Sequence, residues 1–421
     1  MKKAVFLLIL LLLIFSEGYS QTNIKTMFYN LLYYPSGDPQ DREATLKDIL
    51  DIYQPDIFTV CELETVEGAD EILTQSIQTS RPNFARATFV SNQSDTNPDN
   101  QLNQMVFYNT DMFTLESQIT HTTYIRDIMQ YTLLLKSEDQ ATNPIRIEYF
   151  VVHFKSSDGT ANKAIRLDMA NVFTAVLENL DPNAYVVFSG DFNLYTSSEP
   201  AYQEILDSTN AIVMIDPIND NSSLQSWSND TPTYTAMHTQ ATRVFQQNGN
   251  GAFSGLDDRF DFSFISENLT TSTDLFYVAN SYDAYGNNKN CYNLDINNPS
   301  CTGTYSQSLR DDLYRMSDHL PVVMELQTPQ NILTIDEFSS ENNLRILGSN
   351  LINNNVSLYI SPNLFNSDLL IYNHLGQLIK TVKTTNTTQI SIDVSNFPTS
   401  IYIITSVKNK FINPIKFVKI N

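Results

Sequence analysis

Residues 185–193, YVVFSGDFN, give the clearest indication of the fold. A run of apolar residues leads into Gly190 and then into the polar residues Asp191 and Asn193. A run of this kind predicts a buried strand that ends in a polar loop. The stretch SDHLPVV, at residues 317–323, has a related arrangement, in which an acidic residue and a histidine precede the apolar run. Both stretches therefore place polar side chains at the end of a buried strand.

Other polar side chains end or interrupt apolar stretches elsewhere in the chain. They are Asn30 in MFYN, Glu62 in PDIFTVCE, His153 in VVHFK, Asp261 in RFDFSFIS, and Asp318 and His319 in SDHLPVV. Taken singly, each has an ordinary structural explanation, such as a solvated strand end, a turn or a hydrogen-bonded buried histidine. Taken together, they are polar groups at the ends of several strands, and such groups can converge on one pocket.

Strand and helix patterns alternate around these motifs. The spacing of apolar residues predicts helices at 42–53 and 161–180, whereas residues 84–155 are mostly strands. Many strands are apolar on both faces, which is typical of inner strands in a two-layer sandwich covered by helices. We therefore expect an α+β fold with four layers in the order αββα.

The first 20 residues predict a secretory signal peptide. Two lysines precede an apolar run at residues 4–15, and small residues precede Gln21. An anchoring helix is the alternative, but the apolar run is too short to span a bilayer stably. We therefore expect a chain that is exported by its signal peptide, secreted or held at the cell surface, with no stable membrane span.

Charge is distributed unevenly along the chain. Residues 336–421 carry five acidic and seven basic side chains, and residues 1–20 carry a net charge of +1. Residues 21–335 therefore carry a net charge of −25, whereas the whole chain carries −22. Such an acidic region repels a polyanion at long range, which excludes tight non-specific binding of nucleic acid. It does not exclude turnover, because divalent cations can neutralise the contact locally.

This charge step suggests two domains. The last 80 or so residues are rich in Asn, Thr, Ser and Ile and contain short β patterns, which predict a small all-β sandwich. The expected organisation is a signal peptide at 1–20, a first domain at 21–328, a linker at 329–339 and a β-sandwich at 340–421.

Three cysteines are present. Cys291 and Cys301 bracket the short polar stretch CYNLDINNPSC, which predicts a local disulfide in an exported chain. Cys61 lies in an apolar strand and is expected to be a buried free thiol. No CxxC motif or paired histidine accompanies the cysteines, so their spacing indicates no zinc site.

The order and spacing of the strand-end motifs resemble the endonuclease/exonuclease/phosphatase superfamily over roughly residues 23–328. MFYN, PDIFTVCE, VVHFK, SGDFN, RFDFSFIS and SDHLPVV carry the resemblance. The sequence departs from the family at Cys61, where the family usually has Gln before its metal-binding Glu. The resemblance implies a DNase I-like fold and hydrolysis of phosphodiesters with Mg²⁺ or Mn²⁺, with Ca²⁺ as a further candidate.

The resemblance also implies roles for single residues. A phosphodiester is anionic and has a poor leaving group, so catalysis needs charge neutralisation and an oriented water. The implied metal ligands are Glu62, the principal one, with Asn30 and Asp318. The implied catalytic residues are Asp191 on the attacking water, Asn193 and His153 on phosphate oxygens, and His319, whose tautomer Asp261 would fix. Whether Asp191 or His319 takes the proton is left open.

Two cationic residues are further candidates for phosphate contacts. Lys155 follows the histidine strand and Arg166 lies in the helix expected at 161–180. A solvated strand end and a solvated helix face are the more favoured interpretations of these two residues.

The favoured function is an endonuclease that hydrolyses extracellular nucleic acid, either DNA or RNA. One alternative is a sphingomyelinase-like lipid phosphodiesterase, although the polar insertion at 280–301 supplies no hydrophobic hairpin. The other is a catalytically inactive surface binding protein on the same fold. The filled acidic and histidine positions weigh against that alternative.

The C-terminal region resembles the sorting domain of the type IX secretion system. The residues that carry the resemblance are DLLIYNHLGQLIKTV at 368–382, ISIDVSNFPTSIYIIT at 390–405 and KFVKIN at 416–421. The sequence departs from the family at Ser400, where the family usually has glycine. The resemblance implies the secretion machinery as a partner and loss of this module on export. An ordinary carbohydrate- or surface-binding β-module is the alternative.

Overall fold

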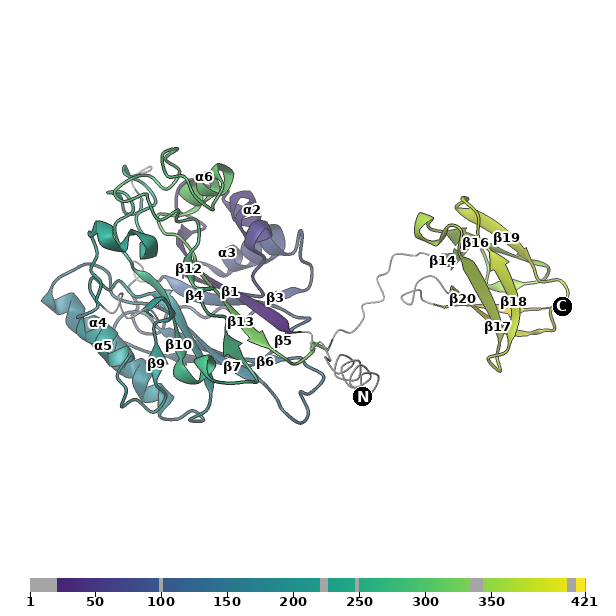
Figure 1. Ribbon diagram of the computed structural model, residues 1–421, viewed down its shortest axis with the longest axis horizontal. Coiled ribbons are helices and arrows are strands. Elements are labelled where there is room, and N and C mark those ends of the chain that lie inside the picture. Colours follow the sequence, from purple (N-terminus) through teal and green to yellow (C-terminus); the bar gives the residue numbers. More distant parts are fainter. Residues whose placement is uncertain are drawn as a thin grey trace, which may run out of the picture. The chain divides into compact units, whose positions relative to one another are not determined.

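The computed structural model describes residues 21–97, 101–219, 226–246, 250–333, 344–406 and 414–420. The expected signal peptide at 1–20 lies outside these residues. The chain divides into two compact units between Leu333 and Thr334 (Figure 1), inside the expected linker. Among the described helices, none is both long and apolar enough to cross a membrane.

The first unit contains two β-sheets. One has the strand order β11-β13-β1-β2-β4-β3, with β12 also paired to β13. Strand β1 is parallel to β2 and antiparallel to β13. The strands of this sheet are β1 (Thr22–Tyr34), β2 (Ile57–Leu63), β3 (Phe84–Arg86), β4 (Asn103–Asn109), β11 (Phe276–Tyr277), β12 (Asp283–Ala284) and β13 (Val322–Thr328).

The second sheet has the strand order β5-β6-β7-β8-β10-β9. Strands β7 and β8 are parallel, and β10 is antiparallel to β8. Its strands are β5 (Phe113–His121), β6 (Ile128–Leu135), β7 (Arg146–His153), β8 (Tyr185–Asp191), β9 (Met214–Ile215) and β10 (Asp261–Ser266).

Alternation along β7 shows how the sheets pack. Tyr149 and Val151 belong to the core that is shared with β1, β2 and β4 of the first sheet. Phe150 and Val152 belong to a separate core, in which Phe173 of the outer helix also packs. Successive side chains of a strand point to opposite faces, so an inner strand covered on both faces is apolar throughout.

Helices form the two outer layers (Figure 1). Helices α2 (Glu43–Tyr53), α3 (Val66–Glu71) and α6 (Gln307–Met316) lie on the first sheet, and α4 (Thr160–Leu177) and α5 (Pro200–Ile205) lie on the second. A π-helical turn continues α3, and short 3₁₀ turns, such as η5 (Pro232–Met237), lie in the connections. The expected α+β fold with four αββα layers is confirmed.

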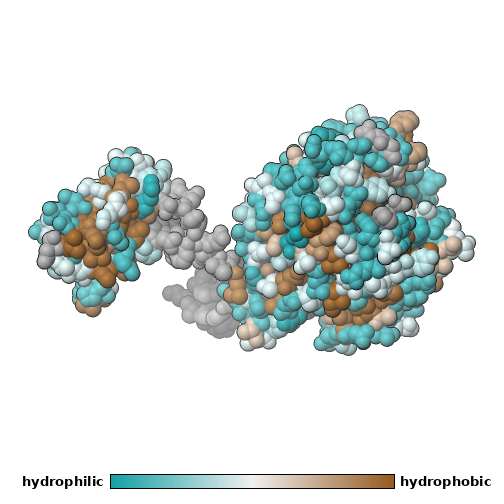
Figure 2. Space-filling view, turned by 180° about the vertical axis from the view of Figure 1, so that it is seen from behind, coloured by the Kyte–Doolittle hydropathy of each residue, from teal (hydrophilic) through white to brown (hydrophobic). Residues whose placement is uncertain are grey.

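The second unit is all-β, as expected. Its sheets have the strand orders β14-β16-β19 and β15-β21-β20-β17-β18. The strands are β14 (Leu344–Ile346), β15 (Leu351–Ile352), β16 (Asn355–Ile360), β17 (Asp368–Asn373), β18 (Leu378–Lys383), β19 (Gln389–Asp393), β20 (Ser400–Ser406) and β21 (Ile415–Lys419). Figure 2 shows apolar side chains gathered on one face of this unit, whereas the first unit is largely hydrophilic on the side shown.

The three cysteines lie in the first unit. Cys291 and Cys301 form a disulfide, with their Cα atoms 5.3 Å apart. Cys61 is a buried free thiol in β2.

Candidate active site

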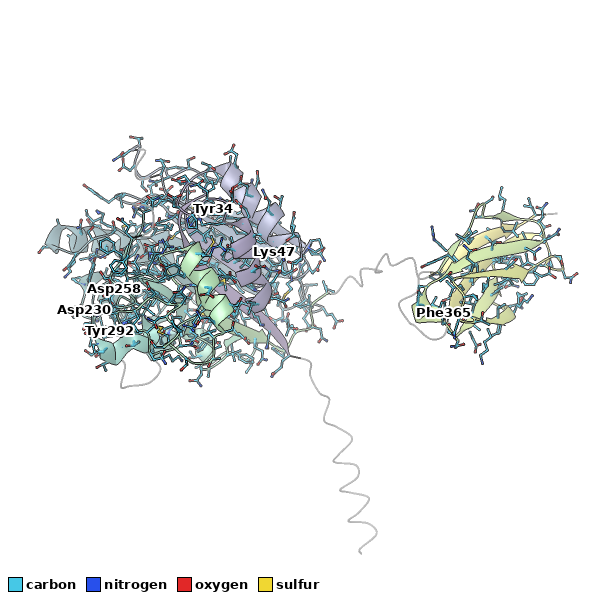
Figure 3. The ribbon with its side chains drawn as sticks, turned by 90° about the horizontal axis from the view of Figure 1, so that it is seen from above. Tyr34, Lys47, Asp230, Asp258, Tyr292 and Phe365 are labelled. Carbon is cyan, nitrogen blue, oxygen red and sulfur yellow. A yellow bond between two sulfur atoms is a disulfide. The ribbon has the colours of Figure 1, made fainter. Side chains whose placement is uncertain are left out.

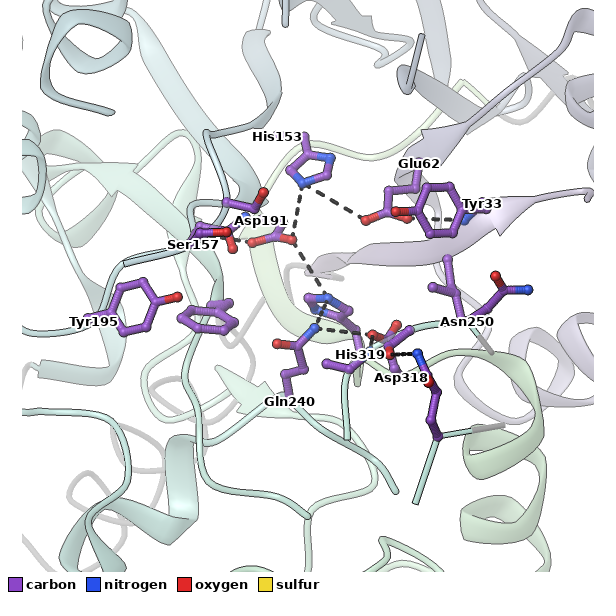
Figure 4. Close-up of a pocket in the computed structure, with 17 residues that line it drawn as sticks. Tyr33, Glu62, His153, Ser157, Asp191, Tyr195, Gln240, Asn250, Asp318 and His319 are labelled. Carbon is purple, nitrogen blue, oxygen red and sulfur yellow. Dashed lines mark hydrogen bonds and ion pairs between the residues drawn. The ribbon is translucent and has the colours of Figure 1, made fainter. Parts of the chain in front are cut away.

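Strand ends from both sheets of the first unit converge on one cavity. The parallel pairs β1–β2 and β7–β8 set Asn30 opposite Cys61 and His153 opposite Asp191 in register. Strand β10 begins with Asp261, which is opposite Asp191. The two sheets pack face to face, so these ends meet between them (Figure 4). All eight predicted metal and catalytic residues are buried, at 8% exposure or less.

Asn30 links the two sheets. Its Nδ2 lies 3.0 Å from Glu62 Oε1 and 3.0 Å from Asp191 Oδ2, and 3.3 Å from His319 Nε2. Its Oδ1 accepts a hydrogen bond from the backbone N–H of Leu32, at 3.0 Å. The amide nitrogen of Asn30 therefore faces the carboxylates, while its oxygen is used by the backbone.

Glu62, His153 and Asp191 form one candidate metal site. His153 Nε2 lies 3.9 Å from Glu62 Oε1 and 3.5 Å from Asp191 Oδ2. The possible ligand atoms of the three residues all lie within 4.8 Å of one another. The second carboxylate oxygen of Glu62 accepts a hydrogen bond from the backbone N–H of Tyr33 at 3.1 Å, which fixes its orientation.

His319 is held by Asp261. The Nδ1 atom of His319 lies 2.7 Å from Asp261 Oδ2, and Nε2 lies 3.7 Å from Asp191 Oδ2. Burial lowers the pKa of His319, but the nearby carboxylates of Asp261, Asp318 and Asp191 outweigh that effect and raise it well above its usual value. The surrounding carboxylates therefore favour the protonated form of the ring.

The other titratable groups are shifted mainly by burial. Burial raises the pKa of Glu62, with a further contribution from Asp318, and raises the pKa of Asp191 to about 8. Burial lowers the pKa of His153 well below its usual value, and the positive charge of Arg126 adds to this effect. Two buried carboxylates thus lie close together at an energetic cost.

The donor set fits a hard divalent cation. In the described part of the chain, the ion pairs of Glu62, Asp191 and Asp261 involve histidines and no Lys or Arg. Buried carboxylates that lack a cationic partner are costly unless they bind a metal, and carboxylate oxygens are the ligands that Mg²⁺, Mn²⁺ and Ca²⁺ prefer.

Asp318 lies in a different part of the cavity wall. Its Oδ2 accepts hydrogen bonds from the backbone N–H of Ala252 at 2.6 Å and from Gln240 Nε2 at 3.3 Å. The candidate metal groups bring Glu62 together with His153 and Asp191 rather than with Asp318. A metal-ligating role for Asp318, and for Asn30, stays a prediction.

Asn193 takes part in the loop after β8. Its backbone N–H donates to Asp191 Oδ1 at 3.0 Å, and its Nδ2 lies 3.4 Å from the carbonyl of Phe154. Its backbone has a left-handed φ of 50°. The side chain lines the cavity beside His153, which fits the expected contact with a phosphate oxygen.

The interpretation of Arg166 as a solvated residue is wrong. Its side chain is fully buried, and its Nε lies 2.5 Å from Glu199 Oε1. Its Nη1 donates to the carbonyls of Lys155 and Ser157, at 2.8 and 2.9 Å. Arg166 therefore fixes the loop that follows β7 and does not extend into solvent. Lys155 is half-buried and donates to the carbonyl of Ser156.

Two residues of the site carry no strand-end signal in the sequence. Gln240 comes from a loop, and its Nε2 lies 2.5 Å from His319 Nε2. Arg126 is 6% exposed and donates to the carbonyl of Phe154 at 3.1 Å, directly after His153. An isolated Gln or Arg in a loop has no periodic pattern around it, so only a comparison of many related sequences could have found either.

The cavity has a volume of about 500 Å³ (Figure 4). Glu62, His153, Asp191, Asn193, Asp318 and His319 line it, whereas Asn30 and Asp261 lie behind them. The remaining described lining residues are Leu32, Tyr33, Ser156, Ser157, Tyr195, Gln240, Gln246, Asn250, Gly251, Ala252 and Phe260.

Comparisons with known proteins give separate results for the two units. Residues 352–419 match the family of secretion system C-terminal sorting domains, which confirms the resemblance of the second unit. No curated protein matches the chain.

Solved structures with similarity to the chain are matched over 72–74% of its length in the three cases that follow. The human Nocturnin catalytic domain with bound sulfate has 14% identity and a TM-score of 0.46, and the match covers 73% of this chain and 96% of that one. An endonuclease/exonuclease/phosphatase family protein from Bacteroides thetaiotaomicron has 16% identity and a TM-score of 0.45, over 74% and 96%. D. rerio TDP2 complexed with single-strand DNA product has 12% identity and a TM-score of 0.44, over 72% and 99%.

Proposed function

We propose that the first unit is a metal-dependent hydrolase of phosphoesters that acts outside the cytoplasm. The observation that carries the proposal is the cluster of Glu62, Asp191, Asp261, His153 and His319 at one cavity. These buried carboxylates and histidines have no Lys or Arg ion-pair partner among the described residues. The arrangement supplies cation ligands, a proton acceptor and a proton donor within one site.

Glu62 is the proposed principal ligand of the cation, with Asp191 and His153 close enough to contribute. Asn30 and Asp318 are expected beside it by resemblance. A bound Mg²⁺, Mn²⁺ or Ca²⁺ would neutralise charge on the phosphate and polarise its oxygens.

Asp191 and His319 are the proposed acid–base groups. Burial raises the pKa of Asp191, which makes its carboxylate a stronger acceptor for the proton of an attacking water. His319, protonated and oriented by Asp261, can donate from Nε2 to a phosphate oxygen or to the leaving group. Asn193 and His153 are proposed to hold non-bridging oxygens.

The second unit is proposed to direct export. The match to secretion sorting domains supports an interaction with a secretion machinery and a location at the cell surface or in the medium. The type IX system is the specific machinery that the sequence resemblance favours. Removal of the signal peptide and of this unit would then leave the first unit as the mature enzyme.

Nucleic acid remains the substrate that the sequence resemblance favours. The test is to incubate the purified chain with plasmid, RNA, sphingomyelin and the simple esters p-nitrophenyl phosphate and bis(p-nitrophenyl) phosphate. EDTA should abolish hydrolysis of the esters that are cleaved, and added Mg²⁺ or Mn²⁺ should restore it. Hydrolysis that survives EDTA would refute the metal requirement. Binding without hydrolysis of any ester would favour the inactive binding protein.

A further inference from the structure

We propose that the substrate of this site carries a single phosphate joined to uncharged, hydroxyl-bearing groups, as in the phosphate esters of sugars and polyols. The inference rests on the proposed phosphoesterase function and narrows its substrate class. It departs from the nucleic acid that the sequence resemblance favours. Three features of the cavity carry it: unused neutral hydrogen-bonding groups, their placement, and the distribution of cations.

Several neutral polar side chains of the cavity are free to bind a ligand. The cavity lining includes Tyr33, Ser156, Ser157, Tyr195 and Asn250. The side-chain polar atoms of these residues make no hydrogen bond to another described residue. The catalytic cluster differs, because its carboxylates already bond to amides and histidines. Hydroxyl and amide groups both donate and accept, so together they can bind the hydroxyl groups of a substrate.

These neutral groups flank the catalytic cluster on two sides. Figure 4 shows Tyr195 and Ser157 on one side of His319 and Asp191, and Tyr33 and Asn250 on the other. On the first side, the ring of Tyr195 lies 5.1 Å from that of Phe260 and meets it edge to face. A phosphate held at the cluster would therefore have neutral, partly aromatic surface beside it, on which a sugar ring or a polyol chain can rest.

The cations near the site are directed into the protein. Among the described lining residues there is no Lys or Arg. Arg166 pairs with Glu199, and Arg42 donates to the carbonyls of Leu31, Leu32 and Met316. Arg126 donates to the carbonyl of Phe154, the residue after His153, and Lys155 donates to the carbonyl of Ser156.

A nucleic acid needs more cationic side chains than the described cavity lining offers. A protein that follows a strand neutralises successive phosphates with Lys or Arg, and residues 21–335 instead carry a charge of −25. The cavity of about 500 Å³ lies in the ordinary size range of sites for small ligands. A small ester with one phosphate needs no row of Lys or Arg side chains, which the described cavity lining lacks, and it avoids the repulsion between a polyanion and the rest of the unit.

The first experiment compares substrates with the full chain and saturating Mg²⁺ or Mn²⁺. We expect a higher kcat/KM for glucose-6-phosphate, glycerol phosphate or glycerophosphoglycerol than for a single-stranded oligonucleotide or RNA. We also expect kcat/KM for these small esters to change by less than about threefold between roughly 50 and 200 mM salt, because few counterions are displaced. Comparison of the three small esters separates sugars, polyols and polyol diesters.

The second experiment removes the neutral groups singly. Tyr195→Phe and Asn250→Ala should each lower kcat/KM for the best hydroxyl-bearing ester by about 3–30-fold, because each deletes a hydrogen bond to a substrate hydroxyl. The same variants should lower kcat/KM for p-nitrophenyl phosphate or its bis ester by a smaller factor, because these esters carry no hydroxyl group for the two side chains to bind. Tyr124→Phe is the matched control, since Tyr124 is 66% exposed and lies outside the cavity lining.

The outcomes separate the two proposals. A better kcat/KM for oligonucleotides, falling steeply with salt, would overturn the substrate class and leave the phosphoesterase function standing. Equal losses on all esters in Tyr195→Phe and Asn250→Ala would also overturn it, because these groups would then not select the substrate. Failure to hydrolyse any phosphoester, the simple nitrophenyl esters included, would refute the proposed function itself.

Discussion

The first unit buries charge in two different ways. Arg259 and Asp216 form a bidentate pair with both N–O distances at 2.8 Å, and Arg166 pairs with Glu199. At the cavity, by contrast, Glu62, Asp191 and Asp261 face amides and histidines. In these two pairs, each carboxylate has its own guanidinium. The carboxylates at the cavity have no guanidinium partner among the described residues, which is what the proposed cation site requires.

The difference has an energetic basis. A buried charge is costly, and a partner of opposite charge with good geometry offsets the cost. The groups paired with a guanidinium should therefore matter for stability, and the carboxylates that face histidines and amides should matter for activity and metal binding. Substitutions in the guanidinium-paired groups and in the cavity carboxylates and histidines test this difference. Figure 3 shows the side chains of both units.

The largest expected effect is on turnover. His319→Ala should lower kcat on the best substrate by on the order of 10²–10⁴, because it removes a positioned donor, with little loss of stability. Steady-state kinetics and a denaturation curve measure the two quantities. Asp261→Asn should fall between wild type and His319→Ala, since the ring remains but its orientation is disturbed.

The double variant sharpens this test. Asp261→Asn combined with His319→Ala should be barely slower than His319→Ala alone, because groups that act as a unit are not additive. Full additivity would mean that the two residues act independently despite their 2.7 Å contact. Unchanged turnover in His319→Ala would remove the site from consideration.

The next effect is on stability. Arg259→Met should lower the free energy of unfolding by about 3–5 kcal/mol, because it leaves Asp216 buried without its partner. Combining it with Asp216→Asn should recover part of the loss. Arg146→Met, which breaks the more exposed pair with Glu116, is the control and should cost less than about 1 kcal/mol. Similar losses in both variants would contradict the contrast.

A divalent cation should stabilise the unpaired cluster. At a Mg²⁺ or Mn²⁺ concentration about 100-fold above Kd, the free energy of unfolding should rise by about 2.7 kcal/mol. Glu62→Gln should raise the metal concentration needed for both stabilisation and activity. Glu64→Gln, which changes a nearby carboxylate outside the cavity lining, should respond to metal like wild type. A wild-type response in Glu62→Gln would rule out Glu62 as the ligand.

A smaller effect concerns His238, a buried histidine away from the cavity. Burial lowers its pKa to about 4, although a backbone hydrogen bond with Leu256 opposes part of this shift. The folded state therefore binds the proton more weakly than the unfolded state, so this contribution is complete above about pH 6.5 and falls as the pH drops toward 4. The loss should be on the order of 2 kcal/mol.

Denaturation curves at several pH values measure this contribution. His238→Gln should flatten the fall in the free energy of unfolding between about pH 6.5 and 4, whatever its stability at neutral pH. His121→Gln changes a partly exposed histidine of the same unit and should leave the fall unchanged. If His238→Gln keeps the steep fall, other groups are responsible.

Much of the arrangement could be predicted from the sequence because its signals are local. Apolar runs on both faces of β7 and β8 predicted inner strands, and polar residues at their ends predicted a shared site. His153 and Asp191 are opposite each other in register, as parallel neighbouring strands require. Parallel strands that end at one sheet edge bring the residues at their ends together. The strand-end motifs were therefore sufficient to predict that His153 and Asp191 lie side by side.

The remainder depends on contacts between distant residues. The sequence around Arg166 does not indicate that this side chain is buried. Its ion-pair partner, Glu199, follows 33 residues later, outside the helix. Gln240 and the bond from Ala252 to Asp318 come from a loop with no repeating pattern. Hydrogen bonds made by loops have no periodicity, so a single sequence could not predict which loop residues would line the cavity.

The pairing of β1 with β13 has a consequence for when the site can exist. Phe28 pairs with Val322, so the strand that supplies Asn30 lies against the one that follows His319. The first and last strands of the sheet must both be synthesised before they can join. A nascent chain on the ribosome would therefore contain Asn30, Glu62 and His153 before His319 has been synthesised, and it would stay inactive until then. Catalytic competence would arrive in one late step, as the last strand docks beside the first.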